Sequence, residues 1–327
     1  MKGLKDILPG FQGGQVKVGP DEIAGMIGLV SVGEIFYIDP GAGSDTANGG
    51  KRADDAYATV AGAYAALTAD QDDVAIIVGT SATGRTAETD NITWAKRRTH
   101  LVGNGPARRI NPRNGLGTAS TLTGETTTAI FTLTGNNCSF TNMSFATFQD
   151  NNILVELQSD YNSFHNVHFQ GIGHDTAGDD ANARSLYLNA SEENEFVNCT
   201  IGLDTVTRSA ANSSLELSGT CARNKFINCD FPIFADAATA TWVKADTGNA
   251  YERFLQFENC FFNNPDGASS TTLTVGFDLS TTGNGDINLI NCNWRGATDL
   301  ANNYTRLFSN SPVVNTANQG LMIIAAT

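Results

Sequence analysis

The stretch Phe226-Ile227-Asn228-Cys229-Asp230-Phe231 is one copy of a phrase that recurs through the middle of the chain. The phrase consists of an apolar residue, any residue, Asn, a small apolar residue or Cys, any residue, and a large apolar residue. Its six copies are centred on Asn142, Asn166, Asn198, Asn228, Asn259 and Asn291, at steps of 24, 32, 30, 31 and 32 residues. An apolar phrase that returns at such an interval is typical of stacked structural units.

Each copy is too short to bury its own apolar residues, so the copies must cover one another. Short strands and turns fill each unit, and helical periodicity is nearly absent. These features predict an all-β solenoid, a parallel β-helix, in which equivalent positions stack at about 4.8 Å. Strict alternation of inward and outward residues fails across the phrase. We therefore place the Asn at a bend, where it tolerates left-handed backbone and its amide can bond the neighbouring copies.

The chain has six cysteines, and four of them occupy one position of successive copies. These four are Cys199, Cys229, Cys260 and Cys292, and the first two copies have Met143 and Val167 there. A position that accepts Met, Val or Cys requires a small or soft apolar side chain, so we predict an internal column of free thiols. Disulfides and zinc are weaker alternatives, because one position of a regular ladder suits neither and no C-x-x-C pair occurs. Free thiols indicate a protein made in a reducing cytoplasm.

The composition excludes several classes of function. The formal net charge of −14 disfavours nucleic acid as a partner. Charged residues make up only 17% of the chain and Gly occurs 33 times, which is typical of a turn-rich all-β protein. The sequence shows neither a signal peptide nor an apolar run of about 20 residues, so we predict no secretion and no membrane partner.

Four segments are predicted along the chain. Residues 1–33 lack the phrase and form an N-terminal arm, residues 34–80 lead into the solenoid, residues 81–300 form its coils, and residues 301–327 form a C-terminal cap or tail. The apolar side chains of the arm favour docking on a partner surface, and a flexible terminus is the alternative. The docking residues are Ile7, Leu8, Phe11, Ile23, Met26 and Ile27.

The order of elements over residues 34–105 is a further indication of the fold. We expect a strand at 34–38, a loop rich in Gly, Asp and Asn at 39–50, a helix capped by Thr59, a strand at 74–79, and a strand ending in a Gly-Asn-Gly turn at 99–105. This layout resembles the opening of pectate-lyase-like β-helix proteins, many of which are phage-borne. The resemblance implies a right-handed parallel β-helix whose first helix plugs the open end. It supports the fold much more than an activity.

The catalytic patterns of that family are incomplete in this sequence. The resemblance would imply clustered Asp residues with an Arg base for a calcium-dependent pectate lyase, or Asn-Thr-Asp, Asp-Asp and Gly-His-Gly for a polygalacturonase. Neither set occurs. Gly173-His174-Asp175 matches only part of the Gly-His-Gly motif and fits a polar loop better.

A second strand precedes the phrase in each coil, and its outward residues form a polar column. These residues are Glu156, Tyr187, Glu216, Lys244 and Asp278. Glu156 and Glu216 lie two coils apart, about 10 Å, close to the roughly 6.5–9.5 Å between the carboxylates of an inverting glycosidase. They are the candidate catalytic pair, and a wet or subunit-packed sheet face is the favoured alternative. Asn162, Asn194 and Asn224 predict another ladder, where each coil leads into its next strand.

An acidic loop and a group of arginines each have two interpretations, as ordinary polar turns or as a site that binds calcium or a partner. Asp39, Asp45 and Asn48 have oxygen ligands suited to calcium, but a turn-forming loop is expected because EF-hand spacing is absent; we predict no metal and no cofactor. A basic cluster is expected to be a solvated turn face or a contact with an acidic partner. Its members are Arg97, Arg98, Arg108, Arg109 and Arg113.

The sequence favours a structural role over an enzymatic one. A cytoplasmically made solenoid with an arm and an apolar tail resembles the β-helix proteins that phages place on the capsid as cement or decoration trimers. We therefore expect a homotrimer that binds the major capsid protein, assembled in the host cytoplasm and carried on the virion. The alternative is a receptor-binding tailspike that binds or cleaves host polysaccharide. A secreted bacterial lyase is disfavoured by the absent signal and the incomplete motifs.

Overall fold

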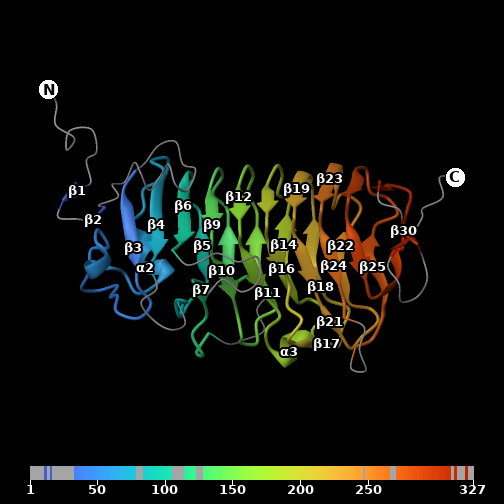
Figure 1. Cartoon of the computed structure of the whole chain (residues 1–327), viewed down its shortest axis with the longest axis horizontal. Helices are drawn as coiled ribbons and strands as arrows, with labels where there is room; N and C mark the ends of the chain where they lie inside the picture. Colours follow the sequence, from blue (N-terminus) through green and yellow to red (C-terminus); the bar gives the residue numbers. More distant parts are fainter. Residues whose placement is uncertain are drawn as a thin grey trace.

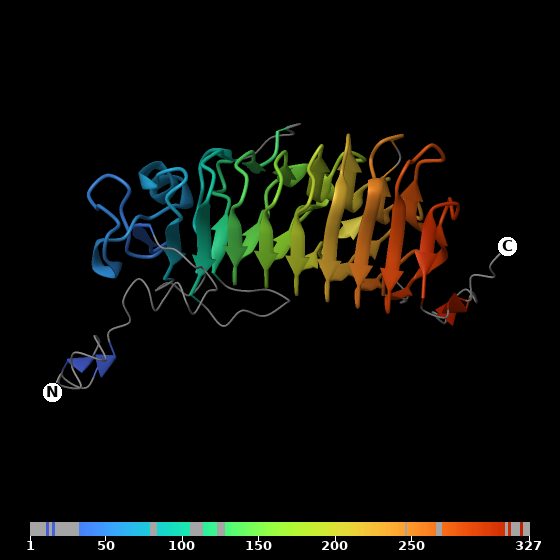
Figure 2. The same ribbon diagram turned by 90° about the horizontal axis from the view of Figure 1, so that it is seen from above.

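Three long parallel sheets form a rod, and from residue 99 to residue 301 each coil passes through all three (Figure 1, Figure 2). The computed structural model describes residues 33–78, 84–104, 114–122, 128–245, 247–265 and 270–310. It also places the backbone of two short strand pairs, β1 (Phe11–Gln12) with β2 (Gln15–Val16) and β30 (Val313–Val314) with β31 (Leu321–Met322). The parallel β-helix predicted from the repeats is confirmed.

The first sheet has ten strands. They are β3 (Ile35–Ile38), β4 (Asp73–Ile77), β6 (Thr99–Gly103), β9 (Ser139–Thr141), β12 (Ser163–His165), β15 (Glu195–Val197), β19 (Ala222–Ile227), β23 (Glu252–Glu258), β26 (Asp286–Ile290) and β29 (Leu307–Ser309). The second sheet has seven strands. They are β7 (Gly115–Gly117), β10 (Ser144–Ala146), β13 (His168–Gln170), β16 (Thr200–Ile201), β20 (Asp230–Pro232), β24 (Phe261–Asn263) and β27 (Asn293–Arg295).

The third sheet has eight strands. They are β5 (Ile92–Trp94), β8 (Phe131–Leu133), β11 (Ile153–Leu157), β14 (Arg184–Asn189), β18 (Ser213–Ser218), β22 (Thr241–Ala245), β25 (Leu273–Leu279) and β28 (Ala297–Ala301). Loops of varied length join the second sheet to the third. They carry the short helix α3 (Asp175–Gly178) and the paired strands β17 (Thr207–Arg208) and β21 (Phe234–Ala235).

The repeated Asn makes the corner between the first and second sheets. All six copies have left-handed backbone, with φ between 52° and 58°. The corner shifts the inward–outward alternation by one residue, so that Phe226, Cys229 and Phe231 all lie in the core while Asp230 faces outward. This shift explains why alternation fails across the phrase. The amide of Asn166 donates to Asn142 Oδ1 at 2.9 Å, and that of Asn228 to Asn198 Oδ1 at 3.3 Å, so the predicted amide contacts between copies are present.

Equivalent core side chains stack along the rod axis. The rings of Phe140, Phe164, Phe196, Phe226 and Phe257 follow one another with centroids 4.5–5.0 Å apart and planes within 15° of parallel. The cysteine column is confirmed: the thiol of each of its four members donates to the carbonyl of the stacked Phe one coil earlier, at 3.3–3.4 Å. All six cysteines are free and buried.

The second predicted ladder is confirmed at the corner between the third and first sheets. Asn162, Asn194 and Asn224 are almost completely buried, and each side-chain oxygen accepts from the coil before it. The hydroxyls of Ser159 and Ser191 accept from the side-chain amides of Asn162 and Asn194. This ladder satisfies backbone N–H groups that the corner removes from the sheets.

The helix α2 (Val60–Ala66) lies at the N-terminal end of the rod (Figure 1) and covers its core, as the sequence predicts. The Thr59 hydroxyl accepts from the Gly62 N–H at 2.9 Å, which confirms the predicted cap. The buried carboxylate of Glu88 accepts from Val60 N at 2.8 Å and Ala61 N at 3.2 Å, a second cap that the sequence did not indicate. Burial raises the pKa of Glu88 above its ordinary range.

The strands nearest this end are apolar on both faces. Phe36, Ile38, Ala75 and Ile77 point into the main core, whereas Ile35, Val74, Ile76 and Val102 form a separate apolar cluster on the opposite face of β3, β4 and β6. We call this second group the outer apolar cluster. Its members are buried, so the first three strands of this sheet are covered on both sides.

Some predictions fall outside the described residues. The arm residues Ile7, Leu8, Ile23, Met26 and Ile27 are among them, and Phe11 is placed only as backbone in β1. Arg108, Arg109 and Arg113 also lie outside. Among the residues that are described, no helix is both long and apolar enough to cross a membrane.

Candidate functional site

The polar column predicted on the third sheet is present in register. Glu156 pairs with Tyr187, Tyr187 with Glu216, Glu216 with Lys244 and Lys244 with Asp278 on successive parallel strands. Two strand spacings separate Glu156 from Glu216, about 10 Å at the usual distance between strands. The predicted juxtaposition is therefore correct, and its chemistry depends on what each carboxylate contacts.

The Glu216 carboxylate is held by a two-pronged ion pair. Arg184 Nε donates to one carboxylate oxygen and Arg184 Nη2 to the other, each at 2.8 Å. Only 12% of either side chain is exposed, and the guanidinium carbon lies 4.8 Å from the centre of the Tyr187 ring. A carboxylate fixed in this way braces two coils together.

Glu156 is tied to its neighbours by neutral donors. Its Oε1 accepts from Gln158 Nε2 at 2.8 Å and from Asn189 Nδ2 at 2.9 Å. The whole residue is 8% exposed, and Glu216 is 9% exposed, so these two members of the column are more buried than residues of a wet sheet face. Both carboxylates link adjacent strands, which favours bracing over catalysis by this pair.

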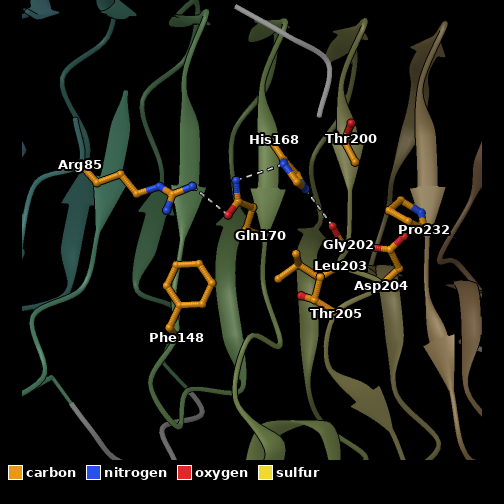
Figure 3. Close-up of a pocket in the computed structure, with 10 residues that line it drawn as sticks. All are labelled: Arg85, Phe148, His168, Gln170, Thr200, Gly202, Leu203, Asp204, Thr205 and Pro232. Atoms are coloured by element: carbon orange, nitrogen blue, oxygen red, sulfur yellow. Dashed lines mark hydrogen bonds between the residues drawn. The ribbon is translucent and has the colours of Figure 1, made fainter. Parts of the chain in front are cut away.

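A hollow of about 240 Å³ opens on the outer side of the second sheet (Figure 3). Arg85 and Phe148 lie on one side of it, and Leu203, Asp204 and Pro232 on the other. The outward residues His168 and Gln170 of β13 lie between them. Because Phe169 of the same strand stacks on Phe145 in the core, its two neighbours face away from the core.

A chain of hydrogen bonds fixes the polar groups of the hollow (Figure 3). Arg85 Nη2 donates to Gln170 Oε1 at 3.0 Å, Gln170 Nε2 lies 3.1 Å from His168 Nδ1, and His168 Nε2 lies 3.0 Å from the Gly202 carbonyl. A carbonyl oxygen only accepts, so Nε2 carries the proton and Nδ1 accepts from the Gln170 amide. That leaves Gln170 Oε1 to accept from Arg85, and the imidazole is neutral.

Burial reinforces this neutral state. It lowers the pKa of His168 from 6.5 to about 4, and the nearby Arg85 charge acts in the same direction. The accepting residue, Gly202, has φ +114°, and an added Cβ would lie 2.5 Å from the Pro232 carbonyl oxygen. Glycine is therefore required where the coil turns its carbonyl toward His168.

The polar loops considered as metal or catalytic sites are used for chain geometry. Asp39 Oδ1 accepts from the N–H groups of Gly41 and Ala42, and Asp45 accepts from Ala58 N, Thr59 N and the Thr59 hydroxyl. The expected turn-forming loop is confirmed. His174 caps α3, since its Nδ1 accepts from Thr176 N at 3.2 Å. Across the described ranges, no cluster of three or more His, Cys, Asp or Glu side chains could hold a metal ion.

The described part of the predicted basic cluster is paired with acidic side chains. Arg97 forms an ion pair with Asp70 at 2.8 Å, and Arg98 forms one with Asp72. All four side chains lie at turns of neighbouring coils, as expected of a turn face.

Sequence reasoning missed the hollow. One signal was present: the residue two positions after the repeated Asn faces outward, and His168 is the one copy with an imidazole there. Arg85, Phe148 and Asp204 lie in loops outside the repeat, so their meeting with His168 depends on loop paths that the phrase does not encode.

Comparison with known proteins shows the fold. No protein-family model matches this chain, and no curated protein matches it. The pectate lyase Pel9A aligns with a TM-score of 0.52 and 15% identity, over 80% of this chain and 62% of that chain. The fold is shared with pectate lyase. This chain spans 62% of that enzyme's length, and at 15% identity the likeness carries no activity across.

Pectin methylesterases also align, at lower scores. PemA from Erwinia chrysanthemi has a TM-score of 0.47 and 12% identity over 84% of this chain and 80% of that chain. The enzyme from Aspergillus niger has a TM-score of 0.47 and 14% identity over 90% and 91%.

Proposed function

We propose that this protein is a non-enzymatic structural component of a bacteriophage virion, a decoration or cement protein that attaches to the capsid shell by its N-terminal end. The observation that carries the proposal is the outer apolar cluster on β3, β4 and β6. Strands that are apolar on both faces directly follow the arm in the chain. Their outer residues are already buried within this chain, so we assign attachment to the apolar residues of the arm itself.

The remainder of the rod suits a structural role. Stacked phenylalanines, two amide ladders and the Arg184–Glu216 ion pair connect neighbouring coils. A solenoid held in this way is rigid along its axis. Attachment as a homotrimer to the major capsid protein would multiply a weak contact of each arm by avidity.

The test uses the full chain and empty shells of the phage that carries the gene. We expect the wild-type protein to sediment with the shells as a trimer and to raise their thermal stability. Removal of residues 1–33 should abolish sedimentation while the rod stays folded. Phe308→Ser is the matched control, because this half-exposed aromatic lies on β29, the last strand of the first sheet, at the other end of the rod from β3, and its loss should leave binding intact. Shell binding that survives the truncation would contradict the proposal.

A second candidate function is recognition of host polysaccharide by a tailspike-like protein, which the hollow beside Phe148 favours. If this candidate includes cleavage by the column carboxylates, Glu156→Gln and Glu216→Gln would each abolish the release of reducing ends. Unchanged cleavage in both variants, or none by the wild type, would remove Glu156 and Glu216 as a catalytic pair.

A further inference from the structure

The hollow on the second sheet is rigid before any ligand arrives. The hydrogen-bonded chain Arg85–Gln170–His168–Gly202 joins the segment before β5 to β13 and to the turn after β16, and His168 and Gln170 are buried. Because each group in the chain has a fixed donor or acceptor role, the polar wall of the hollow keeps one arrangement. Preorganised polar groups beside apolar surface are characteristic of ligand sites.

An aromatic ring borders this wall. Phe148 is 48% exposed, a large value for a phenylalanine, and the Arg85 guanidinium carbon lies 5.5 Å from its ring centre. Leu203 and Pro232 line the opposite side (Figure 3). The hollow thus offers apolar surface to a ligand that also needs hydrogen bonds at its edge. A pyranose ring has this character, with C–H groups on its face and hydroxyls around its rim.

The charges at the rim favour a neutral ligand. Asp204 is exposed at one side of the hollow, and Arg85 lies at the other. A carboxylate can accept from two adjacent hydroxyls at once, and a guanidinium donates to hydroxyl or ring oxygens. An acidic sugar would be attracted by Arg85 but repelled by Asp204 and by the formal net charge of −14. A volume of about 240 Å³ also limits the occupant to a single ring.

We propose that the hollow bounded by Arg85, Phe148, His168, Gln170, Leu203 and Asp204 binds one neutral pyranose unit through its apolar face and two adjacent hydroxyls. The inference deepens the second candidate function by naming its site and sugar class. It concerns binding alone, so pyranose binding can be present when shell attachment and glycan cleavage are both absent, and the reverse.

The experiment is saturation-transfer-difference NMR on the full-length protein with methyl pyranosides of glucose, galactose and mannose, and with methyl galacturonoside as the acidic counterpart. We expect saturation transfer to at least one neutral pyranoside, strongest at the C–H protons of one ring face, and weaker transfer to the acidic one. Phe148→Ala should weaken binding by about tenfold, because it removes the stacking surface. Asp204→Asn should weaken it several-fold, because the amide accepts two hydroxyls less well than a carboxylate does.

The matched control is Phe261→Ala. Phe261 is also exposed, at 39%, and faces outward on the same sheet at the position equivalent to His168, but it lies outside the hollow. This variant should bind as the wild type does. Since Phe148 is half exposed, Phe148→Ala should keep its melting temperature, which separates lost binding from lost folding. Absence of transfer from every neutral pyranoside, stronger binding of the acidic one, or equal losses in Phe148→Ala and Phe261→Ala would overturn the proposal.

Discussion

The side-chain oxygen of Asn224 accepts two hydrogen bonds from Asn194, one from its backbone N–H at 2.9 Å and one from its side-chain amide at 3.1 Å. Asn194 in turn accepts the same two bonds from Asn162, at 2.9 Å and 3.1 Å. Both links are buried, and together they join three consecutive coils. Each oxygen therefore satisfies one backbone and one side-chain donor of the coil before it.

We predict that Asn194→Ala destabilises the rod by about 2–4 kcal/mol. The substitution leaves the Asn162 N–H buried without its acceptor and removes the side-chain donor to Asn224 Oδ1, so the cost of unsatisfied groups adds to that of the lost bonds. The measurement is the shift in chemical-denaturation midpoint. Asn284→Ala is the control, since Asn284 is exposed although its amide also reaches a neighbouring coil, at Asn249. Equal shifts in the two variants would contradict the prediction.

At the other amide ladder, we predict that glycine replaces asparagine better than alanine does. Asn228 has φ 55°, where a Cβ costs about 1–2 kcal/mol and glycine costs nothing sterically. Asn228→Gly should therefore be more stable than Asn228→Ala by about 1 kcal/mol. The order should not hold at Asn194, which lacks positive φ. Midpoints for the four variants check both statements, and an alanine at position 228 as stable as glycine would count against the left-handed corner.

Because of the repeats, the sequence predicts the structural features that recur at the same position in successive coils. The left-handed Asn corner, the thiol column, the polar column from Glu156 to Asp278 and the buried Asn ladder all follow from position in the repeating coil, and each is present. The inward–outward assignment across the corner could not be made from the residues alone, because a single left-handed residue changes the alternation.

Contacts between unlike segments could not be predicted. Glu88 caps helix α2 by accepting from Val60 and Ala61, which precede it by 28 and 27 residues. Arg184 of β14 pairs with Glu216 of the adjacent strand β18. Glu88 and Arg184 have no residue of the same type at the aligned positions of the adjacent coils, so the repeat does not predict either pairing. The hollow depends in the same way on Phe148 and Asp204, which lie in loops of different length after β10 and β16.

The thiol column should make stability fall at alkaline pH. Burial raises the pKa of Cys229 and Cys260 above the ordinary value of 9.0, and in Cys292 a side-chain hydrogen bond with Cys260 and burial act in the same direction. Above pH 9 the unfolded thiols lose protons that the folded ones keep, so the unfolded state is favoured as pH rises. The raised pKa values of Tyr251 and Tyr304 act in the same sense.

Cys260→Val isolates this effect, because Val167 already occupies the same position in another coil. We expect the variant to fold and to lose less stability than the wild type between about pH 8 and about pH 10. The measurement is the urea midpoint at each pH. An alkaline loss as large in the variant as in the wild type would show that Cys260 does not contribute to it.

On the acid side, His168 should destabilise the fold as pH falls from 6.5 toward 4. Its folded pKa of about 4 lies below the ordinary 6.5. Between these two pH values the unfolded chain binds a proton that the folded chain does not bind, so stability is lost as the pH falls. The full effect is about 3 kcal/mol. His100, whose pKa burial also lowers, acts in the same sense, and Glu88 acts in the opposite one. Both remain in His168→Gln, so the difference between the proteins isolates His168. Denaturation midpoints at pH 7 and pH 4.5 should show a shallower loss in this variant, and parallel losses would mean that His168 keeps its ordinary pKa in the fold.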